Sequence, residues 1–519
     1  MANDAKTKME IQAERKAQKL ERKAKEKKAQ KKTSVKNVII VVCVILMFAL
    51  AIALFAYKQV VTSGIIERST TAMSTENYKV SVSMMTYFFN SGYQNFAGQY
   101  GDYLSSFGLD TSKSLKEQTS MDGSSTWYDY FLDSAKSQAE QLLVLCEGAK
   151  ANGVTLEDED YDEINEALNN YKTSAANYGY NANTYVKLIF GTSVNLKDMK
   201  KCLELSQLAS KYATYVSESY EYTAEDYKTY FDENADSYTY VDYVKYTFAA
   251  TADDDGNYAE EDIAAMKAKS DELLATDSVD AFKEYVRAYL VETETAKLAE
   301  DATLDEATID STVAGLLTTH VTKESAGNAA DWAFDAERKV GDTFVDANDE
   351  KGSYTVYMIS NTSYIDDYTT KNGAYIFLSN SNNTDEAGAV AKADEVIAAW
   401  EASDKTEKTF LDMTEEYSDA GHIHEIIKNI KKDQPYSDLL YAEDVVPGTV
   451  SKIVSTEQEG VFVVYYAGDG ELSAWEADVD SALRNEQYSA DYEEMTATYT
   501  VTTVDNAVNK VVPVSMASK

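Results

Sequence analysis

Residues 241–248 of the chain read VDYVKYTF, a run in which β-branched and aromatic residues are mixed with Asp, Lys and Thr as in a half-buried β-strand. Helical patterns follow at about 259–275 and 278–300, and strand-like runs return at 343–345 and 354–359. This order of a strand, helices and two further strands predicts a small α+β unit.

The same order of elements then occurs a second time. Residues 374–379 (AYIFLS) predict a strand, 386–400 and 406–417 predict helices, and 449–454 and 461–466 predict strands. Gly341 precedes Tyr354 by thirteen residues and Gly448 precedes Val461 by thirteen, so the closing strands share one register. We interpret the two stretches as a divergent internal duplication.

The region before residue 238 has a helical pattern instead. Small and apolar residues recur every three or four positions within 135–149 and again within 161–178, and Gly153 and Gly179 follow these two runs. Further helices are expected at about 184–190, 196–218 and 223–234. The first half of the chain is therefore predicted to be a helical domain.

An uncharged run of twenty residues, Val38 to Tyr57, separates a basic head from an acidic remainder. Residues 1–36 hold 13 Lys and Arg against 5 Asp and Glu, which leaves 35 against 83 for the rest. Twenty helical residues span roughly 30 Å, the thickness of the apolar part of a bilayer. The positive-inside rule predicts a single-pass protein of the cell membrane with a cytoplasmic N-terminus and an extracytoplasmic bulk. A cleaved signal peptide, with Ala51-Ile52-Ala53 near the cleavage site, is the alternative.

The amino-acid composition argues against nucleic-acid binding and against metal or cofactor chemistry. The excess of acidic residues would repel nucleic acid, so no nucleic-acid partner is expected. Three His residues and no Gly-rich phosphate loop make a metal site or a cofactor unexpected. His422 and His424 flank one residue of a loop and fit surface positions better than metal ligands, and His320 is given no role. Cys146 and Cys202 form either one disulfide or two buried free thiols.

Several segments together resemble the PrsA and SurA families of extracytoplasmic foldases, whose repeated units are parvulin-type (PpiC-like) peptidyl-prolyl isomerase domains. The resemblance covers roughly residues 78–475. Its motifs are the linker YTAEDYKTYFDEN at 222–234, the turn VPGTVS at 446–451, which resembles the parvulin "kpGeiS" turn, and the helix end at 410–419, which is similar to "Fa.lAkeySdD". The resemblance implies a fold class of α+β: one N-terminal transmembrane helix, an α-helical SurA-N-like domain and two tandem parvulin-like units.

The sequence departs from the parvulin pattern where that family carries its catalytic histidines. In the second unit the two positions fall on Tyr375 and Phe462, and in the first they fall on Tyr246 and Tyr354. All four imidazoles are absent. The resemblance therefore implies parvulin-like domains that lack full isomerase activity, with an active peptidyl-prolyl isomerase and an envelope scaffold as the alternatives.

Aromatic residues at helical spacing follow residue 86. They include Tyr87, Phe88, Tyr93, Phe96 and Tyr100. The simpler interpretation is a core-facing stripe. The functional one is that these residues line a cradle for unfolded chains, as the resemblance implies, because tyrosine offers a wide apolar face with a polar tip.

These observations predict a membrane-anchored foldase or chaperone that binds unfolded or newly exported polypeptides. The expected segments are a basic head at 1–36, a transmembrane helix at 37–58, a helical domain at 59–236, parvulin-like units at 237–365 and 366–475, and a C-terminal tail at 476–519 that packs back or is partly disordered.

Overall fold

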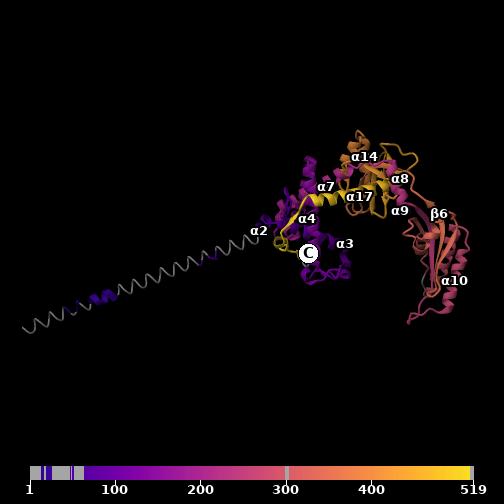
Figure 1. The fold of residues 1–519 in the computed structure, drawn as a ribbon, viewed down its shortest axis with the longest axis horizontal. Coiled ribbons are helices and arrows are strands. Elements are labelled where there is room, and N and C mark those ends of the chain that lie inside the picture. Colours follow the sequence, from indigo (N-terminus) through magenta and orange to yellow (C-terminus); the bar gives the residue numbers. More distant parts are fainter. Residues whose placement is uncertain are drawn as a thin grey trace, which may run out of the picture. The chain divides into compact units, whose positions relative to one another are not determined.

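The computed structural model describes residues 63–298 and 303–514, together with a few positions between residues 13 and 51. The chain divides into two compact units, shown with their element labels in Figure 1. Unit 1 contains Met1–Ser219 and Tyr488–Lys519, and unit 2 contains Tyr220–Gln487. The long helix α17 (Ala474–Thr498) begins in unit 2 and ends in unit 1.

Unit 1 is mainly helical. Its helices are α2 (Ile65–Ser69), α3 (Val82–Tyr100), α4 (Trp127–Ala151), α5 (Asp158–Asn177), α6 (Ala182–Phe190), α7 (Leu196–Glu218) and α18 (Asp505–Val508), with short 3₁₀ turns η1 (Gly101–Phe107) and η2 (Leu115–Glu117). Side chains at the helix starts explain where several of them begin. Thr126 and Asn195 each accept hydrogen bonds from the first-turn backbone in a capping box.

A small antiparallel sheet completes unit 1 and joins its two ends. Its strands β1 (Thr71–Ser74), β2 (Lys79–Ser81) and β11 (Thr502–Thr503) lie in the order β11-β1-β2. Met73 pairs with Thr503, so the C-terminal part of the chain lies beside its N-terminal strand. Val508 and Val511 are buried in the same core as Trp127 of α4. The helical domain therefore needs residues from the far end of the sequence.

Unit 2 begins with two short helices and a four-stranded antiparallel sheet. The elements are α8 (Ala224–Glu233), α9 (Ala235–Tyr238), β3 (Tyr240–Ala249), α10 (Glu260–Leu274), α11 (Val279–Lys297), α12 (Glu306–Ala314), β4 (Leu317–Val321), η3 (Gly327–Ala329), α13 (Ala330–Ala333), β5 (Thr343–Asn348) and β6 (Ser353–Tyr364). The strands lie in the order β4-β3-β6-β5. Val244 and Phe248 of β3 pack on Phe282 and Val286 of α11.

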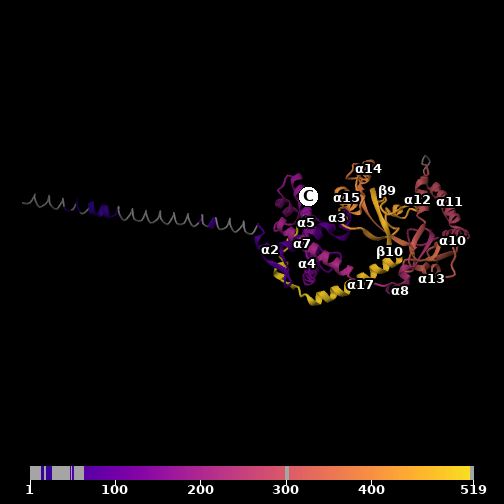
Figure 2. The ribbon, with the colours of Figure 1, turned by 90° about the horizontal axis from the view of Figure 1, so that it is seen from above.

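A second sheet follows in unit 2. Its elements are β7 (Thr369–Ser379), α14 (Glu386–Ala402), α15 (Glu407–Tyr417), β8 (Ile427–Ile430), α16 (Ser437–Leu440), β9 (Val450–Ser455) and β10 (Gly460–Ser473). The strand order is β8-β7-β10-β9. Ile376 and Val463 face α14 and α15, where Trp400 and Phe410 are buried. Figure 2 shows these two helices beside β9 and β10.

The two sheets have the same strand order, because in each the first strand pairs with the second and the last, and the last pairs with the third. They also share a register. Tyr246 pairs with Val356 in the first sheet, as Ile376 pairs with Val463 in the second. The predicted strands at 241–248, 354–359, 374–379 and 461–466 and the helices at 386–400 and 406–417 are confirmed.

The predicted fold class is wrong in one part, the transmembrane helix. No helix among the described residues is long and apolar enough to cross a membrane. The two 25-residue helices α4 and α17 have the length, but charged side chains follow their exposed faces. Most of the predicted span at 37–58 lies outside the described residues. What the structure supports is a mixed α and β architecture, and the predicted limits of the six segments stay a prediction.

Candidate functional site

The parvulin-equivalent positions of the second sheet lie on the face that points away from α14 and α15. The rings of Tyr375 on β7 and Phe462 on β10 are 5.5 Å apart. Tyr436, which precedes α16, packs at 5.0 Å from the first and 5.2 Å from the second. Burial raises the pKa of Tyr436 to about 12. An aromatic cluster with the buried Leu440 therefore covers this face of the sheet.

The positions predicted in the first sheet lie on the other kind of face, against the helices. Tyr246 packs beside Phe248, with 4.9 Å between the rings, and burial raises its pKa to about 12. Tyr354 is 1 % exposed and donates a hydrogen bond of 2.9 Å to Asp349. In the shared register, Lys245 and Thr355 correspond to Tyr375 and Phe462, each one residue from the predicted position. A shift of one residue reverses the face of a strand.

The aromatic stripe of α3 contributes mainly to the core of unit 1. Phe88 and Tyr93 are 2 % and 1 % exposed, so neither offers a free face to a polypeptide. Tyr87 is half-buried against Phe190 of α6, with ring centroids 4.7 Å apart. Phe96 and Tyr100 are also half-buried and pack on each other at 4.7 Å. This placement favours the interpretation as a core stripe, and a peptide-binding role of the five residues stays a prediction.

The remaining sequence candidates are two cysteines in unit 1 and three histidines in unit 2. Cys146 and Cys202 are buried free thiols, and burial raises the pKa of both. His422 and His424 lie in a loop after α15 with their rings 4.1 Å apart. His320 on β4 lies 3.2 Å from the Asp366 carboxylate. Within the described ranges, no three His, Cys, Asp or Glu side chains are arranged to hold a metal ion.

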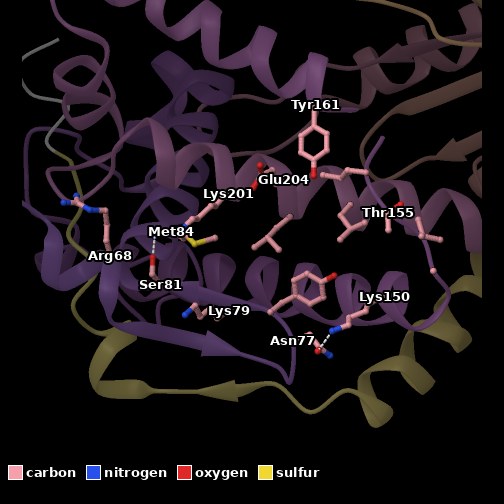
Figure 3. Close-up of a pocket in the computed structure, with 16 residues that line it drawn as sticks. Arg68, Asn77, Lys79, Ser81, Met84, Lys150, Thr155, Tyr161, Lys201 and Glu204 are labelled. Atoms are coloured by element: carbon pink, nitrogen blue, oxygen red, sulfur yellow. Dashed lines mark hydrogen bonds between the residues drawn. The ribbon is translucent and has the colours of Figure 1, made fainter. Parts of the chain in front are cut away.

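Unit 1 contains a cavity of about 680 Å³ between β2, the end of α4, the α4–α5 loop, α5 and α7. Figure 3 shows Tyr161 of α5 on one side of it and Asn77 and Lys150 on the other. Much of its lining is apolar. The apolar lining residues are Tyr78, Met84, Val154, Leu156, Tyr161, Leu205 and Leu208. The shape and lining suit apolar side chains of a ligand.

The charged groups of this cavity are mostly positive, although the whole chain carries a net charge of −40. Arg68, Lys79, Lys150 and Lys201 line it, against one carboxylate, Glu204. Arg68 is held by hydrogen bonds to backbone oxygens of 2.9 and 2.7 Å. The three lysines are exposed, and none forms an ion pair within the part of the chain that the structure describes. A cationic rim thus surrounds the apolar lining.

Among the described residues, no strand pairs with the outer edge of β2, the strand beside this cavity. β2 lies at the end of the sheet, and its Lys79 and Ser81 line the cavity. The Tyr78 carbonyl accepts from Thr75 N at 3.0 Å, and Val82 N donates to the Thr70 carbonyl at 2.9 Å, so these two residues face β1. Because backbone groups alternate along a strand, those of Lys79 and Ser81 point away from β1. An extended chain could pair with them.

The turn that carries Tyr78 and Lys79 is held to α4 by Glu147. This side chain is 4 % exposed, and it accepts hydrogen bonds of 2.7 Å from both Asn77 N and Asn77 Nδ2. Burial alone would raise the pKa of the Glu147 carboxyl, but the bonds from Asn77 outweigh it and the pKa lies below its ordinary value. Glu147 therefore positions one wall of the cavity.

Reasoning from the sequence did not identify this cavity. Its lining comes from residues between 68 and 208 on separate elements, and no spacing in the sequence links them. The sequence feature that relates to this cavity is the presence of three lysines, Lys79, Lys150 and Lys201, in a strongly acidic chain.

No protein-family model matches the sequence, and no curated protein is significantly similar to it. A solved structure similar to part of the chain is the foldase protein PrsA from Streptococcus pneumoniae str. Canada MDR_19A, at 15 % identity, over 48 % of this chain and 77 % of that one. The TM-score is 0.20.

Proposed function

We propose that the chain binds extended segments of unfolded polypeptides, and that the cavity beside β2 holds them. The observation that carries the proposal is the combination of an apolar lining, a cationic rim and an unpaired strand edge in one cavity. A polypeptide can use all three, because it brings apolar side chains, carboxylates and a backbone with free hydrogen-bonding groups. A small apolar ligand would use only the first.

The expected binding is weak and reversible. Burying one large apolar side chain contributes about 1.5–3 kcal/mol, so two client side chains supply about 3–6 kcal/mol. Lost freedom of the two molecules offsets about 4 kcal/mol or more of this. Main-chain pairing with β2 and ion pairs of about 0.2–1 kcal/mol each with the exposed lysines provide the remainder. A protein that holds unfolded chains has to release them, and this balance allows it.

The test measures whether the purified full chain suppresses aggregation of reduced insulin, followed by light scattering. Suppression at a several-fold molar excess is expected. Tyr161→Ala removes one exposed wall of the cavity and should weaken suppression, whereas Tyr103→Ala, at an exposed residue that does not line the cavity, should not. Absence of suppression by the unchanged chain, or equal suppression by Tyr161→Ala and Tyr103→Ala, would refute the proposal.

An active prolyl isomerase is the second candidate from the sequence. Tyr375 and Phe462 pack in a cluster without an imidazole, which favours binding over catalysis. Lowering a barrier of about 18–20 kcal/mol needs a shaped site around the prolyl bond. A refolding reaction limited by proline isomerisation decides between the two, since an isomerase accelerates it and a protein that only holds the unfolded chain does not. The extracytoplasmic location stays a prediction.

A further inference from the structure

A second feature of unit 1 shows how this fold holds an extended segment. Residues Val511–Val514 lie across α3 and α6. The side-chain amide of Asn90 forms hydrogen bonds with their backbone. Asn90 is fully buried; its Oδ1 accepts a hydrogen bond of 2.8 Å from Val514 N, and its Nδ2 donates to the Val512 carbonyl at 3.2 Å. The same Nδ2 donates to the Phe190 carbonyl at 2.9 Å, which fixes the amide against α6.

The hydrogen bonds that Asn90 makes to residues 512 and 514 are compatible with a proline at position 513 between them. Asn90 donates to the carbonyl of the residue before Pro513 and accepts from the N–H of the residue after it. No hydrogen bond therefore involves an N–H at position 513 itself. Proline has no backbone N–H and holds its φ near −65°, so it fits such a contact without a lost hydrogen bond and with little conformational entropy to lose. The chain has only three prolines in 519 residues, and one of them lies here.

The neighbouring backbone leaves room for the contact. Gly191 ends α6 with φ of 108°. A Cβ at this position would lie 3.0 Å from Thr86 Cγ2, 3.5 Å from Asn90 Nδ2 and 3.7 Å from the Val512 carbonyl oxygen. Glycine is favoured here because it accepts this φ and because a Cβ would crowd Thr86, whereas the distances to Asn90 and Val512 are ordinary contacts.

An open cavity of about 850 Å³ continues beside this segment. Three tyrosines line it: Tyr178 and Tyr185 stack with rings 5.8 Å apart and 14° between their planes, and Tyr180 lies nearby in the sequence. Tyr178 is 70 % exposed, Tyr180 48 % and Val512 62 %. Aromatic grooves of this kind bind extended proline-containing segments, because the ring faces pack on a backbone that is already extended.

We propose that this groove is a docking site for extended apolar polypeptide segments with a central proline, and that residues 512–514 are its tethered occupant. We infer this class of partner from the segment that occupies the groove, Val512-Pro513-Val514. A client segment takes the place of residues 512–514 on Asn90 and extends over Tyr178 and Tyr185. This site is separate from the cavity beside β2, and its existence does not depend on the function proposed for that cavity.

A tethered segment competes strongly with a free one. A short flexible link gives an effective concentration on the order of millimolar. For a free peptide that binds the empty groove with a dissociation constant of about 10–100 μM, the tail weakens binding by about ten- to a hundredfold. The groove is therefore open only to clients that bind well or to a chain whose tail has been displaced.

The experiment uses a fluorescein-labelled, amidated peptide of residues 509–514 (NKVVPV) and fluorescence anisotropy. Three proteins are compared: the full chain, a chain that ends at Val511, and the full-length variant Val514→Pro, which lacks the N–H that Asn90 receives. The shortened chain keeps α18 and Val511, which belong to the core. A second peptide carries an N-methyl group on the residue equivalent to Val514, so it tests the Asn90 contact without changing the protein.

We expect the shortened chain to bind the peptide about ten- to a hundredfold more tightly than the full chain, with Val514→Pro between them. The N-methyl peptide should bind about tenfold more weakly, since it cannot donate to Asn90. Tyr103→Ala in the shortened chain should change nothing, because Tyr103 is exposed and lines neither cavity. Equal binding by all three proteins, equal binding of the two peptides, or no binding by Val514→Pro would overturn the proposal. If the shortened chain loses its near-UV circular dichroism, Val514→Pro and the N-methyl peptide decide alone.

Discussion

Replacing Glu147 should loosen the turn that forms one wall of the cavity beside β2. Glu147→Ala removes both acceptors of Asn77, whose N–H and Nδ2 each lie 2.7 Å from the carboxylate. A hydrogen bond to a charged group contributes about 1.5–3 kcal/mol, and water can reach the exposed Asn77 once the carboxylate is gone. We therefore expect a loss of about 2–4 kcal/mol in the free energy of opening this part of unit 1.

Glu147→Gln keeps the shape of the side chain and removes its charge. Its amide keeps one acceptor but places a donor opposite Asn77 Nδ2, and Asn77 cannot simply turn its amide because Oδ1 accepts from Lys150. The expected loss is about 1–3 kcal/mol. Glu140→Gln is the matched control, since Glu140 is exposed on the same helix and should change stability by less than about 0.5 kcal/mol.

Hydrogen exchange of the β1–β2 turn and α4, read by mass spectrometry, reports this region without mixing in unit 2. The effect should depend on pH in a definite direction. Because the folded pKa of Glu147 lies below its ordinary value of 4.5, its stabilising contribution is present above that pH and is lost as the pH falls through the folded pKa. The difference between the unchanged chain and Glu147→Gln should shrink in that window. Equal exchange in Glu147→Ala and Glu140→Gln at neutral pH would refute the reasoning.

Three further outcomes follow from the packing. Gly148→Ala would place a Cβ 2.3 Å from the Tyr212 ring, so it should destabilise unit 1 by about 1–3 kcal/mol in urea unfolding; an unchanged midpoint would contradict the close approach. Cys146 and Cys202 are buried with raised pKa values, so alkylation mapped by mass spectrometry should leave both unmodified until urea is added; rapid labelling of the native chain would contradict their burial. Trp400→Ala should cost unit 2 about 3–5 kcal/mol, since the ring is 1 % exposed between Phe410 and Tyr465; a loss below about 1 kcal/mol would contradict this packing.

The strands of unit 2 could be predicted from the sequence, but their faces could not. In β3, Tyr243 and Phe248 are both buried although they point to opposite faces of the sheet. Alternation identifies the core face only when the other face is polar. Aromatic residues on both sides remove that signal, so the sequence alone aligns Tyr246 one residue away from the position that the register gives.

The small sheet of unit 1 and its two cavities could not be predicted for a different reason. β1 and β11 have four and two residues, and they pair although 430 positions separate Met73 from its partner Thr503. Such short strands have no recognisable period. The hydrogen bonds of Asn90 to residues 512–514 likewise join positions more than 400 residues apart. A single Asn in the sequence does not predict such a contact.

The two sheets of unit 2 differ on the face where the sequence resemblance predicts a catalytic site. In the second sheet Tyr436 and Leu440 cover it. In the first, the corresponding residues Lys245 and Thr355 are polar, and Thr355 shares a hydrogen bond of 2.8 Å with Thr247 across the strands. At these positions the face is filled in the second sheet and polar in the first, although Tyr243 and Tyr357 are buried farther along the face of the first sheet. Neither sheet carries an imidazole at these positions. The proposed polypeptide binding is therefore better supported in unit 1, where two cavities combine apolar walls with polar side chains.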